Sequence, residues 1–224
     1  MSDLAARPGE LTALEQAIAA LEGQRQILGD QVVETALAPL VDKRDRLLAA
    51  SVGEQRKLVT VLFADLVDST PLAQRLDAED LQQVMSRYFA AVRAAVEAEG
   101  GVVEKFIGDA AMAVFGLYRS REDDAARAVR AALAMVGALE RLSGQVEASH
   151  GVRLQMRVGI DTGEMVVTGL ADRASGEFLV VGETANRAAR LQTAARPGTV
   201  LLSADTTRQV RGEFGLRRIR GLEL

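Results

Sequence analysis

The sequence of 224 residues contains no cysteine, no tryptophan and a single histidine, His150. Without cysteine, the chain can form no disulfide, no thiolate metal site and no cysteine nucleophile. With one histidine, a metal site built from several histidines is excluded as well. Any metal bound by this chain would therefore be a hard cation such as Mg²⁺ or Mn²⁺, held by carboxylate and carbonyl oxygens.

Long hydrophobic runs and an excess of positive charge are also missing. No apolar stretch approaches the about 20 residues that a membrane span needs, and the N-terminus, MSDLAARPGE, lacks the pattern of a secretory signal. The formal net charge of −4 provides no basic footprint for nucleic acid or for an anionic membrane. We therefore expect a cytoplasmic protein with no nucleic-acid partner and no membrane segment.

Lysine is scarce. It occurs only at Lys43, Lys57 and Lys105, whereas arginine supplies the other basic residues of the sequence. Positions that need only a positive charge have thus accepted arginine, and Lys105 marks a position where arginine would not serve. Asparagine is scarcer still and occurs only at Asn186.

What is present divides the chain into two parts. From Glu10 to about Ala50, aliphatic residues recur every three or four positions, which indicates amphipathic helices. Gly29 predicts a helix stop, and Pro39 predicts a bend or an interruption in the helix that follows. We expect an N-terminal helical extension over residues 1–53, either a hairpin packed on its own domain or a dimerising segment.

After residue 53, short hydrophobic strands alternate with amphipathic helices. This order predicts an α+β sandwich, with helices on one face of a mostly antiparallel sheet. The expected helices are 79–99, 121–148 and 182–195, and the expected strands are 57–65, 102–106, 110–115, 153–161, 164–170, 199–203 and 214–224.

Asp65 and Asp109 are the acids that such a fold would bring together. Asp65 ends a buried strand, and Asp109 lies in the turn of the hairpin expected to pair beside it. Two carboxylates at one end of a sheet suit a pair of Mg²⁺ or Mn²⁺ ions about 3.5–4 Å apart, an arrangement used in phosphoryl transfer. Gly108 would let the turn approach a ligand closely. Each acid alone is equally compatible with an ordinary strand end or turn.

Three motifs in order carry a resemblance to a known family: FADLVDST at 63–70, EKFIGDAAMAVFG at 104–116 and VGETANRAARLQ at 181–192. Together they resemble the catalytic domain of class III nucleotidyl cyclases, the adenylate and guanylate cyclases. The resemblance implies a ferredoxin-like α/β sandwich of the class III cyclase type over residues 54–224, lacking a final strand. It also implies further domains in a longer protein.

The resemblance implies roles for individual residues. Asp65 and Asp109 would bind two metal ions, with the carbonyl of Leu66 as an additional ligand. Asn186 would orient the ribose, and Arg190 would stabilise charge on the α-phosphate in the transition state. These last two residues are one helical turn apart, so both can face one ligand.

Recognition of the substrate involves three more positions. Lys105 matches the lysine that reads the base in adenylate cyclases, whereas guanylate cyclases have glutamate there. Leu179 stands where adenylate cyclases have Asp or Thr, and its side chain cannot accept a hydrogen bond from an amine. Arg220 matches a lysine that touches the terminal phosphates, although a basic edge strand would explain it equally well. We therefore expect ATP as the substrate, with GTP as an alternative.

The resemblance implies that ATP is converted to 3′,5′-cyclic AMP and pyrophosphate between the two chains of a head-to-tail homodimer. One alternative is a guanylate cyclase or a cyclase of relaxed specificity. Another, favoured by Leu179, is a nucleotide-binding regulatory module that has lost turnover. A diguanylate cyclase is disfavoured, because its hairpin should carry Gly-Gly-acid-Glu-Phe where this chain has Ile-Gly-Asp-Ala-Ala.

Overall fold

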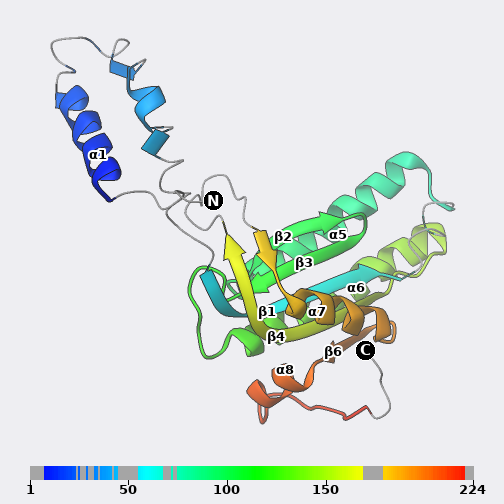
Figure 1. Cartoon of the computed structure of the whole chain (residues 1–224). Coiled ribbons are helices and arrows are strands. Elements are labelled where there is room, and N and C mark those ends of the chain that lie inside the picture. The colour runs from blue at the N-terminus through cyan, green and yellow to red at the C-terminus, as the bar shows by residue number, and fades with distance from the viewer. Residues whose placement is uncertain are drawn as a thin grey trace. The chain divides into compact units, whose positions relative to one another are not determined.

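The computed structural model describes residues 8–23, 25, 29, 33, 34, 36–41, 43, 44, 55–67, 72, 75–168 and 179–219. The chain forms two compact units (Figure 1): Met1–Gln55 with Val167–Val180, and Arg56–Val166 with Val181–Leu224. Residues 51–54, where the sequence predicts the domain boundary, lie outside the described residues.

The N-terminal unit contains helical segments that pack on each other. Helix α1 spans Pro8–Gly23, and its Ile18 packs against Val33 and Leu37 from the helical residues that follow. Leu21, Leu40 and Val41 border this cluster. The segment 36–41 is helical throughout, so Pro39 does not interrupt it.

The sheet has six strands in the order β2-β3-β1-β4-β5, and β6 pairs in parallel with β4. The strands are β1 Gln55–Leu66, β2 Val102–Ile107, β3 Ala110–Phe115, β4 Met156–Thr168, β5 Leu179–Val181 and β6 Thr199–Leu202. The helices are α5 Ala78–Ala98, α6 Asp124–His150, α7 Glu183–Ala194 and α8 Ala204–Gln209. The predicted α+β fold is confirmed. No helix in the described part of the chain is long and apolar enough to cross a membrane.

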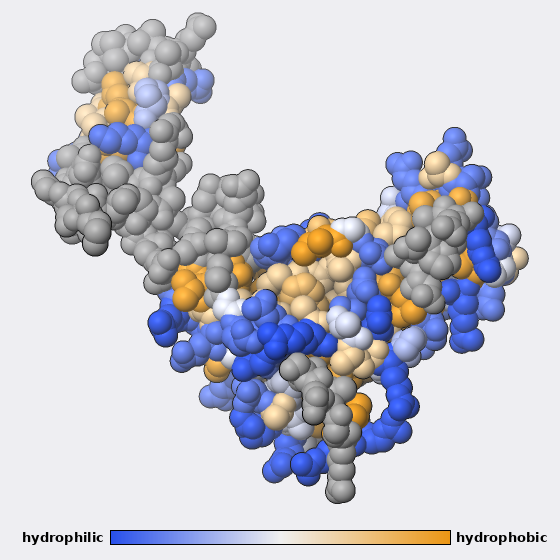
Figure 2. Space-filling model, turned by 45° about the vertical axis from the view of Figure 1, so that its right-hand side comes forward, coloured by the Kyte–Doolittle hydropathy of each residue, from blue (hydrophilic) through white to orange (hydrophobic). Residues whose placement is uncertain are grey.

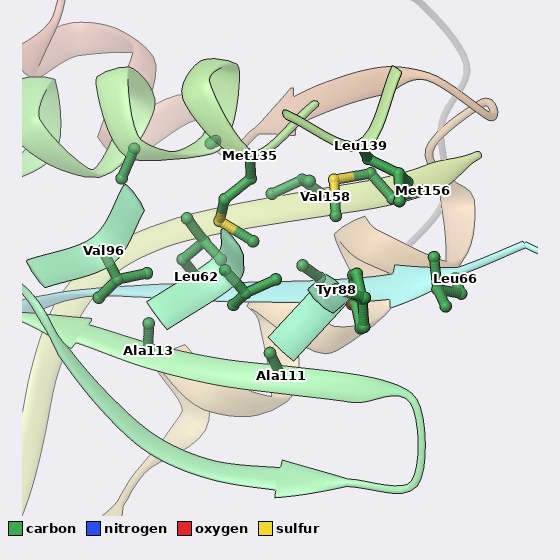
Figure 3. Packing of buried hydrophobic residues seen from close by; sticks show 14 of the residues in the cluster. Leu62, Leu66, Tyr88, Val96, Ala111, Ala113, Met135, Leu139, Met156 and Val158 are labelled. Atoms are coloured by element: carbon green, nitrogen blue, oxygen red, sulfur yellow. The ribbon is translucent and has the colours of Figure 1, made fainter. Parts of the chain in front are cut away.

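Helices α5 and α6 cover one face of the sheet. Asp77 begins α5 by accepting hydrogen bonds from the backbone N–H groups of Glu79 and Asp80, at 3.0 and 2.9 Å. Valines and a tyrosine recur every four residues along α5 and are buried, so they form a single apolar stripe. Figure 3 shows Tyr88 and Val96 of this stripe, with Met135 and Leu139 of α6, packed over residues of strands β1, β3 and β4. Each fully buried valine contributes about 1.5–3 kcal/mol to folding.

Helix α7 covers the opposite face of the sheet. Val158 and Ile160 of β4 belong to the core under α5 and α6, so Gly159 between them faces the other way. A Cβ at Gly159 would lie 2.2 Å from the backbone N of Gln192 and 2.3 Å from the carbonyl O of Ala188. Helices therefore cover both faces of the sheet, and the prediction of one covered face was wrong.

Two predicted strands proved to be one. Residues 153–161 and 164–170 were expected to pair with each other, but β4 runs from Met156 to Thr168 without a turn. Gly163, which lies between the two expected strands, allows close packing of helix α7. A Cβ there would lie 2.5 Å from Oγ1 of Thr184 in α7.

The C-terminal strand expected over 214–224 is not formed in the part that the structure describes. Residues 214–219 belong to no strand. Leu216 and Ile219, two apolar residues of this segment, are 44% and 51% exposed. The sequence analysis also missed α8, Ala204–Gln209. Ser203 caps this helix, and its hydroxyl accepts a hydrogen bond of 3.1 Å from the backbone N–H of Thr206.

The close contacts at Gly159 predict that adding a single methyl group there lowers the stability of the fold strongly. Gly159→Ala should destabilise the protein by more than about 3 kcal/mol, because both crowded neighbours are backbone atoms that cannot move aside. In helix α6, a Cβ at Gly144 would have no atom within 4 Å. Gly144→Ala should therefore be neutral or stabilise by up to about 1 kcal/mol. Urea denaturation of both variants tests this, and equal midpoints would contradict it.

Candidate active site

The pairing of β1 with β3 brings Asp65 and Asp109 together. Ala64 pairs with Ala111, so Asp65 at the end of β1 lies next to the turn that precedes β3. Gly108 in this turn has a φ of 63°, a conformation that glycine adopts at little cost. Both carboxylates thus lie at one end of the sheet, within hydrogen-bonding reach of each other.

The environment disfavours the charged form of Asp65. Burial raises the pKa of this carboxyl most, and the charge of Asp109 together with a side-chain hydrogen bond to it raises the pKa further. Arg157 acts in the opposite direction but does not cancel these effects. Two like charges in a partly buried place are stable only if a cation or a proton compensates them.

Three residues that the sequence analysis did not single out support this pair. The guanidinium of Arg157 and the amide of Gln192 both reach Oδ2 of Asp65, at 3.3 and 3.2 Å. The hydroxyl of Tyr88 donates a hydrogen bond of 3.0 Å to the carbonyl of Asp109. Burial and the charges of both aspartates raise the pKa of Tyr88, so its hydroxyl remains a neutral donor.

A signal for two of these residues was present in the sequence. Arg157 lies between the buried hydrophobic residues Met156 and Val158 of β4, and Gln192 falls on the buried stripe of α7 together with Thr184, Ala188 and Leu191. A polar side chain on an apolar face needs a polar partner. For both residues that partner is Asp65.

The donors around the two aspartates fit a hard divalent cation. Asp65 and Asp109 supply carboxylate oxygens, and Leu66 follows as the last residue of β1 with its backbone carbonyl. Among the residues that the structure describes, no three His, Cys, Asp or Glu side chains gather in one place. A cation here would therefore complete its coordination with other oxygens, from water or from a ligand.

The other candidate residues lie apart from the aspartates. Lys105 is 45% exposed and pairs with Glu104. Asn186 and Arg190 are exposed on α7, and the guanidinium of Arg190 lies 3.2 Å from the carboxylate of Glu183. Among the described side chains, none of these three forms an ion pair or a hydrogen bond with either aspartate.

Two predicted residues are described incompletely or not at all. Leu179 begins strand β5, but its side chain is outside the described part. Arg220 lies outside the described residues.

Removal of one charge from the aspartate pair should stabilise the metal-free protein. The pKa of Asp65 is raised in the folded state above its ordinary value of 3.8. The protonated carboxyl therefore favours the folded state; this contribution to the free energy of unfolding is fully present below pH 3.8 and is lost as the pH rises through the raised pKa. Asp65→Asn should therefore raise the melting temperature at pH 7 by on the order of a few degrees. This gain should disappear as the pH falls toward 3.8.

Melting curves with and without Mn²⁺ complete this test. Mn²⁺ should stabilise the wild-type protein and leave Asp65→Asn unchanged. The control is Asp205→Asn, which removes an exposed carboxylate paired with Arg208 and should gain no stability. A destabilised Asp65→Asn at neutral pH without metal would show that the aspartates do not repel each other.

Comparison with known proteins identifies the family. The family model described as the adenylate and guanylate cyclase catalytic domain matches residues 52–221. The crystal structure of the adenylyl cyclase CyaB from P. aeruginosa has a TM-score of 0.65 and 30% identity, covering 71% of this chain and 83% of that one. The guanylyl cyclase Cya2 has a TM-score of 0.68 and 28% identity, covering 77% of this chain and 90% of its own.

Curated proteins with similar sequences are longer than this chain. The uncharacterized protein R02095 of Rhizobium meliloti (strain 1021) is 35% identical over 154 residues, which cover 69% of this chain and 15% of that protein. The uncharacterized protein Rv1319c of Mycobacterium tuberculosis (strain ATCC 25618 / H37Rv) is 31% identical over 189 residues, covering 83% and 32%. The chain thus spans about a third or less of the length of these relatives. The resemblance seen in the three sequence motifs is confirmed, and this chain belongs to the adenylate and guanylate cyclase catalytic domain family.

Proposed function

We propose that this domain converts ATP to 3′,5′-cyclic AMP and pyrophosphate. The observation that carries the proposal is the pair formed by Asp65 and Asp109, two carboxylates held together against their repulsion. A carboxylate whose pKa is raised by burial and by a neighbouring like charge is a candidate for a ligand-binding or catalytic site. In a nucleotidyl cyclase fold, the ligand that fits is a nucleoside triphosphate with Mg²⁺ or Mn²⁺.

The reaction joins the ribose 3′-oxygen to the α-phosphorus and breaks the bond from that phosphorus to the bridging oxygen of pyrophosphate. Two bound ions would lower the pKa of the 3′-hydroxyl and neutralise charge on the departing pyrophosphate. Asp65 and Asp109 would hold them, and Arg157 and Gln192 fix the direction of the Asp65 carboxylate. The 3′-proton leaves to water or to a substrate phosphate. Most of the acceleration comes from positioning and from electrostatic stabilisation.

A second chain completes the site in this proposal. Arg190 would stabilise charge on the α-phosphate and Asn186 would orient the ribose, but both are exposed on α7 and contact neither aspartate of their own chain. A two-fold axis would bring them to the aspartates of the partner and create two equivalent sites. Ile107, beside the Gly108-Asp109 turn, is 55% exposed, and Figure 2 shows hydrophobic surface among hydrophilic residues on one face. Both features suit an interface between chains.

Lys105 makes ATP the proposed substrate, because its ammonium can donate to the ring nitrogen N1 of adenine. Relaxed specificity for ATP and GTP is the second candidate. Leu179 favours it, since leucine provides no acceptor for the exocyclic amine of adenine. Solved structures similar to this chain include one titled an adenylyl cyclase and another titled a guanylyl cyclase, so similarity of fold does not decide the base.

Product analysis tests the reaction itself. The purified protein, incubated with each nucleoside triphosphate and Mn²⁺, should form 3′,5′-cyclic AMP and pyrophosphate from ATP, identified by mass spectrometry. Excess chelator should abolish the product, and Asp109→Ala should lower kcat by at least about 10³-fold while the fold persists. Tight ATP binding without product under all metal conditions would favour a regulatory module instead.

Mixing two inactive variants tests whether the site lies between chains. Asp65→Ala and Arg190→Ala should each be inactive, because every site of either homodimer lacks one essential group. After subunit exchange, a heterodimer collects both defects in one site and leaves the other intact. Random pairing should restore up to about a quarter of the wild-type rate. A silent mixture with exchange confirmed by labelled subunits would place the whole site within one chain.

A further inference from the structure

Glu104 and Lys105 lie together because strand β2 is irregular at this point. Neighbouring residues of a regular strand point to opposite faces of the sheet. In β2, Val103 pairs with Ala113 and Lys105 pairs with Met112, so Glu104 has no partner of its own in the ladder. This bulge lets the Glu104 carboxylate and the Lys105 ammonium approach to 2.8 Å.

The Glu104 carboxylate is held in an unfavourable environment. Its side chain is only 6% exposed, whereas that of Lys105 is 45% exposed. Oε1 of Glu104 contacts the ammonium, and the buried Oε2 has no hydrogen-bond partner among the described residues. A surface ion pair would need no such burial. A buried, half-satisfied carboxylate usually reflects a functional constraint.

We propose that Glu104 is the positioning residue that aims Lys105 at the base of the nucleotide. This inference rests on the proposed function, in which Lys105 reads the base. A free lysine side chain with four rotatable bonds samples many directions, and fixing it costs conformational entropy when the ligand binds. Glu104 fixes the ammonium before binding. The ammonium has three N–H donors; one is used by Glu104, which leaves two for the substrate.

The position of Glu104 also explains how the domain can function with Leu179. A leucine cannot hold the ammonium of Lys105 by charge or by hydrogen bond. Glu104 binds the ammonium instead. It is the neighbouring residue of the same strand, so the carboxylate and the lysine keep their relative position if the strand moves. The anchored ammonium directs a donor at the base, and a donor favours N1 of adenine, which accepts, over N1 of guanine, which carries hydrogen.

Glu104→Gln tests this role, since glutamine keeps the shape and removes the charge that holds the ammonium. We expect the KM for ATP to rise about tenfold with kcat changed less than about twofold, because the base lies far from the reacting phosphate. The preference for ATP over GTP in kcat/KM should fall by about tenfold as well. The melting temperature should not fall, because a buried charge is removed.

A matched control and a double mutant distinguish positioning from structure. Glu97→Gln makes the same change at an exposed carboxylate paired with Arg93 at 3.8 Å and should leave KM and the nucleotide preference unchanged. In a Lys105→Met background, Glu104→Gln should add no further loss, because its effect passes through the lysine. Equal losses in both backgrounds, or an unchanged ATP-to-GTP ratio with ATP turnover intact, would overturn the inference. Absence of turnover in the wild-type protein would instead refute the proposed function.

Discussion

Two carboxylates held side by side repel each other, and the rest of this domain has to keep Asp65 next to Asp109. The hairpin β2-β3 does so by pairing along β1, whose central residues Val61, Leu62 and Ala64 have no exposed surface. The buried residues of α5 belong to the hydrophobic core, and the hydroxyl of Tyr88 in this helix donates a hydrogen bond to the backbone carbonyl of Asp109. The hydrophobic core thus provides the free energy that opposes the repulsion.

Helix α7 contacts the aspartate pair on one side and, on the other side, carries the residues that we propose act in the site of the partner chain. On its buried side, Gln192 contacts Asp65 of the same chain, and the close approach over Gly159 leaves the helix no room to shift. On its exposed side, it presents Asn186 and Arg190. In a two-fold dimer, one helix would therefore hold a metal ligand of one site and supply transition-state groups to the other. The rigidity of this packing sets the relative position of both sets of groups.

The sequence predicted features that depend on local order and failed where tertiary packing decides. Asp65 and Asp109 could be paired in advance, because a strand end and a hairpin turn are local patterns. Residues 153–161 and 164–170 were expected to form two strands, whereas β4 is continuous; Gly163 between them allows close packing against Thr184 of α7, a contact that the sequence alone does not reveal. The contacts of Arg157, Gln192 and Glu104 were not predicted, because a polar residue in an apolar segment indicates that it needs a polar partner and does not indicate which residue that partner is. Roles for Asn186, Arg190 and Lys105 stay predictions, since a partner chain would have to complete them.

Buried polar atoms without a hydrogen-bond partner occur on both sides of the sheet. Among the described residues, four side chains have a buried polar atom without a hydrogen-bond partner: Glu104, Arg127, Arg157 and Asp161. Arg127 belongs to α6, on the core side, and Arg157 and Asp161 lie on β4, where they contact Asp65 and Arg187 of α7. Each such atom costs about 1–3 kcal/mol, which apolar side chains of similar size would avoid. Of these four residues, Arg157 is the one that contacts the aspartate pair, so the cost of its unsatisfied Nε is spent on fixing the carboxylate of Asp65 and not on packing the core.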